Sequence, residues 1–232
     1  MRYFLKGFLY GILGISLIGL IWLMIVRPQL TARDAAELKD EYSETVSGAT
    51  SPGDSVGEES SVDILAMQRQ YPDIKAWLTV PGTVIDYPVL QSSAEDPEHY
   101  LRRNYDDTWR MAGSLFFQYD CTLDSRNLVI FGHNMSDGSM FACLRNMFDA
   151  EFREEHSQII LHTADGTRYF RVVSAMKTDL AQLPFNQPMF QSDNDFLTFA
   201  SKCCRIPMSC PIATSHYLHS SLVHMTGTEP EQ

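Results

Sequence analysis

The residues with the clearest chemical potential lie in the stretch NLVIFGHNMSDGSMF, residues 127–141. An apolar run there ends at Gly132-His133-Asn134, and a polar turn that contains glycine follows it. The imidazole of a histidine titrates near neutral pH, so it can take up a proton and later return it. Loops at the ends of rigid strands often display such groups. His133 is therefore our first candidate catalytic residue.

A histidine in this position also has a structural explanation. His133 could cap the turn through hydrogen bonds with Asn134 or Asp137. Hydrolysis that depends on a metal is a further alternative, with His156 or His162 as additional ligands. The spacing of these histidines shows no closely set ligand group, so we expect neither a metal nor another cofactor.

The cysteines supply no obvious nucleophile for His133. They form neither a CxxC pair nor a zinc-ligand spacing, and their odd number leaves at least one without an intramolecular disulfide partner. Each is more easily explained as a small apolar residue than as a reactive thiol. The five are Cys121, Cys143, Cys203, Cys204 and Cys210.

The N-terminal residues predict a membrane anchor over residues 1–27. The run 7–26 has no charged residue, and as a helix it would span roughly 30 Å, the thickness of the hydrocarbon core of a bilayer. No small-residue cleavage site lies near residues 24–28, which favours an uncleaved transmembrane helix over a signal peptide. We expect a single-pass protein of the cell membrane, with its large C-terminal domain outside.

Residues 28–60 predict a flexible acidic tether. They are rich in Ser, Thr, Gly, Glu and Asp, and the only basic residues among them that offset the eight acidic residues are Arg33 and Lys39. This segment carries over half of the formal net charge of −11. An acidic chain of this kind is not expected to bind nucleic acid.

Residues 61–232 predict one domain that is mainly β with a few peripheral helices. The pairs Pro81-Gly82 and Asp165-Gly166 indicate hairpins between strands 74–80 and 83–90 and between strands 158–162 and 167–174. Further strands are expected at 113–117 and 127–131, a helical turn at 98–105, and helices at 64–71, 140–152 and 193–203. Many short strands without a βαβ rhythm favour a closed β-barrel.

Four blocks together resemble a class B sortase. They are YPDIKAWLTVPGTVIDYPVLQ (71–91), HYLRRNY (99–105), GSLFF (113–117) and NLVIFGHNMSDGSMF (127–141). Their order and spacing match that family, and they cover most of residues 64–175. Four blocks in register are far more specific than any one motif.

The resemblance implies a membrane-anchored cysteine transpeptidase of Gram-positive bacteria. In such enzymes a cysteine attacks the backbone carbonyl of a sorting motif at the C-terminal end of a secreted protein. The acyl-enzyme then passes to an amine, commonly of cell-wall peptidoglycan. Secreted proteins, the peptidoglycan amine and the cell membrane would therefore be the partners, and His133 matches the histidine of the family.

The C-terminal end departs from the family. The nucleophile of a sortase ends a late strand in a Thr-Cys step, and an arginine follows on the next strand. The nearest equivalent here, YLHSSLVHM at 217–225, has no cysteine, and no Lys or Arg follows Arg205. No nucleophile is thus identified. Residues 203–224 also lose the alternating pattern, which suggests a disturbed reading frame or a decayed gene.

Two functions stay open at this point. The first is a sortase-type transpeptidase with His133 as acid and base. The second is a non-catalytic, membrane-tethered module that keeps the peptide groove without turnover, and the missing Cys and Arg favour it for this polypeptide.

Overall fold

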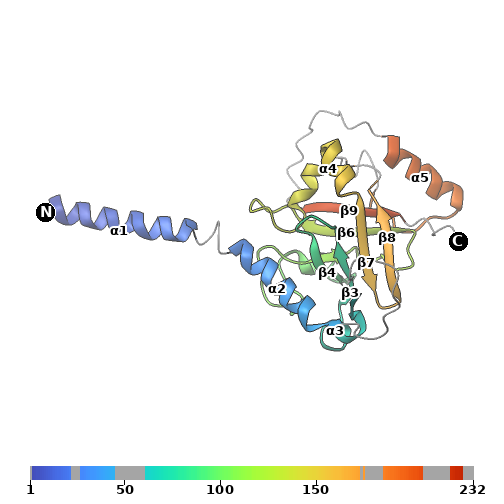
Figure 1. The fold of residues 1–232 in the computed structure, drawn as a ribbon, viewed down its shortest axis with the longest axis horizontal. Coiled ribbons are helices and arrows are strands. Elements are labelled where there is room, and N and C mark those ends of the chain that lie inside the picture. The colour runs from blue at the N-terminus through green and yellow to red at the C-terminus, as the bar shows by residue number, and fades with distance from the viewer. Residues whose placement is uncertain are drawn as a thin grey trace, which may run out of the picture.

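The computed structural model describes residues 2–21, 27–44, 61–172, 175, 185–205 and 220–226. Its centre is a curled, seven-stranded sheet with the strand order β8-β7-β3-β4-β5-β6-β9 (Figure 1). The strands are β3 (Ile74–Thr79), β4 (Asp86–Gln91), β5 (Leu115–Phe117), β6 (Asn127–His133), β7 (Gln158–Thr163), β8 (Gly166–Arg171) and β9 (Ser220–Thr226). A separate pair joins β1 (Ser43–Glu44) to β2 (Ser61–Val62).

The sheet is open, so the predicted closed barrel is wrong. Every neighbouring pair is antiparallel except β4 and β5, which are parallel. A barrel closes only when its last strand pairs with its first. Among the described residues β8 pairs with β7 and β9 pairs with β6, which leaves these two strands at opposite edges of a half-barrel.

Both predicted hairpins are present. The β3–β4 turn has Gly82 at φ 75°, and the β7–β8 turn has Gly166 at φ 134°. These are left-handed backbone conformations that glycine adopts without steric cost. The central strands bury almost every side chain, with Trp77 and Leu78 of β3 and Leu115 of β5 fully enclosed.

The described helices lie outside the sheet, and α1 extends away from it (Figure 1). They are α1 (Arg2–Ile21), α2 (Arg27–Glu41), α3 (Ile64–Gln70), α4 (Ala150–Glu155) and α5 (Asp193–Arg205), with the 3₁₀ helices η2 (His99–Leu101) and η3 (Ala142–Phe148). The single helix predicted at 140–152 is divided at Asp149. This residue has an extended backbone, and its carboxylate accepts a hydrogen bond from Phe152 N at 3.0 Å, which caps α4.

Helix α1 does not confirm the predicted transmembrane helix. Within the described part of the chain, no helix is both long enough and apolar enough to span a bilayer. The predicted apolar run extends to residue 26, whereas α1 ends at Ile21 and the next five residues lie outside the description.

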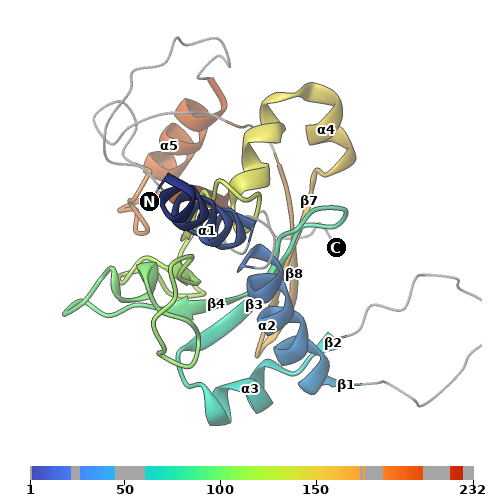
Figure 2. The same ribbon diagram turned by 90° about the vertical axis from the view of Figure 1, so that its left-hand side faces the viewer.

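Helix α2 places the first part of the predicted tether against the domain (Figure 2). Ala35 and Leu38 are buried in the core. Lys39 Nζ donates to both carboxylate oxygens of Asp86 at 2.8 Å, and Trp77 Nε1 donates to the same carboxylate at 2.7 Å. Residues 45–60 of that tether lie outside the described residues.

Candidate functional site

His133 is the last residue of β6, at the point where the chain leaves the sheet. It is buried, and strand β9 pairs beside it with Ser220 directly opposite His133. The carbonyl of His133 accepts a hydrogen bond from Phe141 N at 3.0 Å, and a β-bridge joins Asn134 to Met140. The following turn is thus closed on itself by the backbone.

The side chains proposed to pair with His133 in a structural cap are engaged with other groups. Asp137 Oδ1 accepts from Ser139 N at 2.9 Å and from Ser139 Oγ at 2.6 Å. Asn134 Oδ1 accepts from Arg145 Nη2 at 3.1 Å. These contacts stabilise the turn whatever the protonation state of the imidazole, so His133 retains the role of a candidate acid and base.

Gly132 allows β6 to lie close to the core at the site. A Cβ added to Gly132 would lie 2.6 Å from Phe141 Cδ2 and closer still to Leu115 Cδ2. Only glycine lets β6 approach these two fully buried side chains. The Gly-His step therefore combines a packing requirement with the display of the imidazole.

A small pocket adjoins the turn at Met140. Tyr87, Arg110, Ser114 and Met140 contribute to its lining, and Tyr87 Oη is 3.5 Å from Met140 N. Burial raises the pKa of Tyr87, which keeps its hydroxyl protonated. Sequence reasoning missed this tyrosine and Arg110, because they come from segments that only the fold brings to the turn.

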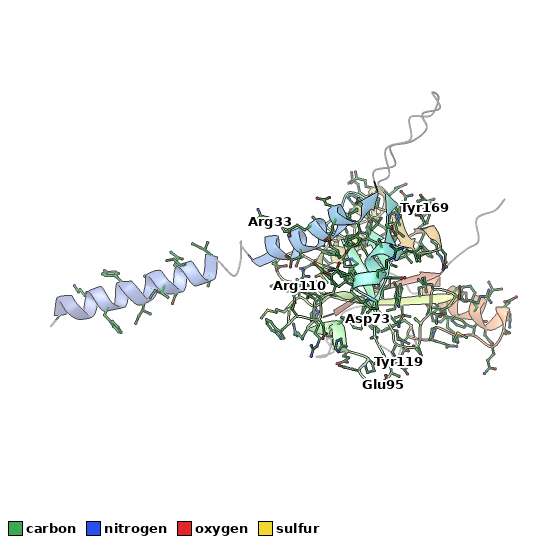
Figure 3. All side chains as sticks on the ribbon, turned by 90° about the horizontal axis from the view of Figure 1, so that it is seen from below. Arg33, Asp73, Glu95, Arg110, Tyr119 and Tyr169 are labelled. Carbon is green, nitrogen blue, oxygen red and sulfur yellow. The ribbon has the colours of Figure 1, made fainter. Side chains whose placement is uncertain are left out.

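Arg110 is a largely enclosed cation beside this pocket. Burial lowers its pKa, the charge of Asp34 on α2 opposes that effect, and its Nη1 donates to Asn104 Oδ1 at 2.6 Å. Figure 3 shows Arg110 near the first half of α2, which carries Arg33. The helix and the turn thus border one polar region. The guanidinium of Arg110 stays protonated at ordinary pH even though burial lowers its pKa.

The two cysteines whose side chains are described are poor nucleophiles. Cys121 is buried, its Sγ lies 3.6 Å from the Asn127 carbonyl, and burial raises the pKa of its thiol to about 11. Burial also raises the pKa of the half-buried Cys143, partly offset by a hydrogen bond with Thr83. Both thiols are protonated at neutral pH, and the thiolate is the reactive form.

The remaining cysteines give no further candidate. Cys203 and Cys204 belong to α5, and nothing of their side chains is described. Cys210 lies outside the described residues. The sites of a nucleophile and an arginine near His133 therefore stay unassigned.

The other two candidate histidines lie apart from His133. His156 Nδ1 is 3.1 Å from the Pro81 carbonyl at the β3–β4 turn, and His162 Nδ1 is 2.9 Å from Thr167 Oγ1. His162 belongs to β7, which β3, β4 and β5 separate from β6 in the sheet. The residues that the structure covers contain no group of three side chains able to hold a metal ion.

Comparison with known proteins identifies the class of this fold. No family model matches the chain. Sortase B of Listeria monocytogenes is 35% identical over 138 residues, and sortase B of Staphylococcus aureus is 28% identical over 142 residues. The matches cover 59% and 60% of this chain but only 55% and 57% of the relatives, so the chain spans about half the length of the curated proteins it matches.

Solved structures extend the similarity over the sheet. A Bacillus anthracis protein described as similar to sortase B is 26% identical with a TM-score of 0.65, covering 85% of this chain and 95% of the other. The structure of the Listeria monocytogenes sortase B is 34% identical with a TM-score of 0.52, covering 59% and 77%. A substrate complex of the Staphylococcus aureus enzyme shares the fold at 20% identity and a TM-score of 0.68, covering 87% and 97%.

The mainly β, half-barrel architecture is that of a sortase. The chain belongs to the class B sortase family.

Proposed function

We propose that the domain recognises a sorting-motif peptide at the His133 turn, where an active sortase would use this histidine as the acid and base of transpeptidation. The observation that carries this proposal is the position of His133 at the end of β6, inside a fold shared with sortase B. An imidazole there can protonate the amine that leaves when a peptide bond is broken. Related sortases have been solved with a substrate and with triglycine, which supports a peptide donor and an amine acceptor as ligand classes.

We further propose that this polypeptide binds its peptide without turnover. Strand β9 begins with Ser220 opposite His133, where the family would bring a cysteine near the histidine. The described thiols of Cys121 and Cys143 are protonated at neutral pH. A hydroxyl is a far weaker nucleophile than a thiolate unless a base activates it.

The biological partners that we propose are those of the family. The peptide would come from a secreted protein with a C-terminal sorting motif, and the acceptor amine from cell-wall peptidoglycan.

We place the domain at the outer face of a cell membrane, with α1 as its attachment, because α1 exposes large apolar side chains such as Phe8, Tyr10 and Ile15. Protease treatment of intact cells, followed by fractionation, tests this location. Protection of the domain from protease would contradict it.

One experiment separates binding from catalysis. A fluorescent sorting-motif peptide with a thiol-reactive group is added to the wild-type chain, to His133→Ala and to the control His162→Ala. We expect anisotropy to show binding by all three proteins, and intact mass to show no labelling that depends on His133. Absence of binding by the wild type would refute peptide recognition at this site.

The alternative is an active transpeptidase. Labelling of the wild type that is lost in His133→Ala but kept in His162→Ala would establish it. Intact-mass detection of an acyl-enzyme with an unmodified peptide would refute the absence of turnover.

A further inference from the structure

His99, in η2, lies between two carboxylates. Its Nδ1 is 3.0 Å from Asp96 Oδ2, and its Nε2 is 2.7 Å from Asp107 Oδ1. An ionised carboxylate only accepts hydrogen bonds, and a neutral imidazole has a single N–H. Both contacts can be hydrogen bonds only when both ring nitrogens carry protons, so this geometry is that of the imidazolium.

The second carboxylate belongs to the tip of a short hairpin, residues 102–110. Arg103 bridges Trp109, Asn104 N donates to the Thr108 carbonyl at 2.9 Å, and Arg110 N donates to the Arg102 carbonyl at 2.8 Å. Asp107 has φ 65°, a left-handed conformation that a non-glycine residue adopts at some cost. A contact from outside the hairpin therefore helps to hold this tip in place.

The charges around His99 favour its protonated form. Burial alone lowers the pKa of His99, but the hydrogen bonds to Asp96 and Asp107 outweigh it, so the pKa stands above its ordinary value. The nearby charge of Arg103, which lies 3.3 Å from Asp107 Oδ1, acts in the opposite direction. On its own helix, His99 packs edge to face on Tyr100, whose hydroxyl donates to Asp73 at 2.6 Å.

We propose that Asp96, His99 and Asp107 form a pH-sensitive clamp that holds the hairpin 102–110 in place while the imidazole is doubly protonated. Loss of one proton leaves a ring nitrogen lone pair facing a carboxylate, and that side of the clamp opens. The hairpin ends at Arg110, which borders the same pocket as Tyr87 and Met140. Opening of the clamp thus loosens the hairpin beside the His133 turn, and this regulation does not depend on the proposed peptide.

The sign of the effect follows from the raised pKa. The stabilisation is fully present below the ordinary histidine pKa of about 6.5 and is lost as pH rises through the raised pKa of the folded protein. The clamp is therefore closed on the acid side of the His99 pKa and open on its alkaline side.

Thermal unfolding of the full chain against pH tests the clamp. The variant His99→Gln, whose amide nitrogen can face only one of the two carboxylates at any pH, is compared with wild type and with the control His162→Gln. At pH 5.5 we expect His99→Gln to melt about 2 to 4 °C below wild type. This difference should shrink above pH 7 and stay absent in the control. A difference that is independent of pH, or no difference at pH 5.5, would overturn the proposal.

A second measurement does not depend on stability. Nitrogen NMR of the imidazole should show both ring nitrogens of His99 protonated at pH 6. In Asp107→Asn, which keeps the side-chain shape and tolerates the left-handed backbone, the pKa of His99 should fall. A wild-type His99 that titrates at or below about 6.5 would refute the clamp.

Discussion

Gly132 controls the site through its missing side chain, because β6 lies against Leu115 and Phe141 where no Cβ fits. We expect Gly132→Ala to lower the free energy of unfolding by about 1 to 3 kcal/mol, since inserted volume forces a packed core to shift. Urea denaturation measures this change. Gly11→Ala, which meets no atom within 4 Å in α1, is the matched control and should leave the domain unchanged. Equal stability of the two variants would show that β6 can move away without cost.

Cys143 provides a prediction about reactivity. Its raised pKa means that the thiolate is scarce at pH 7 and becomes more abundant as pH increases. Alkylation with iodoacetamide, followed by peptide mass analysis, should therefore be slower than for an unfolded chain at pH 7 and should accelerate as pH rises. Cys121, which is 2% exposed, should react only after unfolding. Fast alkylation of native Cys143 at pH 7 would instead mark it as an activated thiol.

At the scale of elements, Asp86 connects α2 to the sheet. Its carboxylate accepts from Lys39, Trp77 and Thr79, and Trp77 is wholly buried. We expect Asp86→Ala to cost about 1 to 3 kcal/mol, because the indole N–H is left without its acceptor. Asp86→Asn keeps an oxygen acceptor and loses only the ion pair, which is worth about 0 to 1 kcal/mol in a partly exposed setting.

The two Asp86 variants are compared by urea denaturation followed by the fluorescence of buried Trp77. Limited proteolysis of α2 reports whether the helix has left the sheet. If both variants lost the same stability, the ion pair rather than the buried indole would dominate this junction.

Helix α5 shows a second way in which an element is fixed to the sheet. Arg126 pairs with Asp193 at the start of the helix and lies 4.3 Å from the centre of the Phe196 ring. The neighbouring Asn127 side chain donates to the carbonyls of Phe185 and Gln187 at 3.0 and 2.8 Å. These contacts come from the beginning of β6, the end opposite to His133, so one strand serves both the site and the attachment of α5.

For the whole molecule, the open sheet has consequences for association. Strand β8 pairs with β7 on one side, and among the described residues no strand pairs with its other side. An accessible edge with apolar side chains promotes pairing between molecules, and charged residues suppress it. Tyr169 on β8 is 53% exposed. We expect Tyr169→Lys to reduce self-association at high concentration.

Light scattering against protein concentration measures this effect. Tyr119→Lys is the matched control, because Tyr119 is also exposed but lies outside the strands. An equal reduction by both variants would attribute association to general surface hydrophobicity and not to the β8 edge.

Parts of the fold were predictable because they depend on neighbours in the chain. The Pro81-Gly82 and Asp165-Gly166 pairs predicted the two hairpins, since turn geometry is set by a few adjacent residues. The helix expected at 140–152 was less accurate. Its apolar spacing suits one helix, but Asp149 adopts an extended conformation and starts a new helix, which periodicity alone does not reveal.

The sequence by itself determined the block around His133, the class B sortase family and the absence of a Thr-Cys step before the C-terminal end. Only the tertiary structure decided that the sheet is open, that α2 packs against Asp86, that the described thiols are too buried to ionise readily, and that His99 lies between two carboxylates. Motifs and turns are encoded over short spans of chain. Strand closure, burial and charge pairing instead depend on residues such as Lys39 and Asp86 that are distant in sequence, so their contacts exist only once the chain has folded.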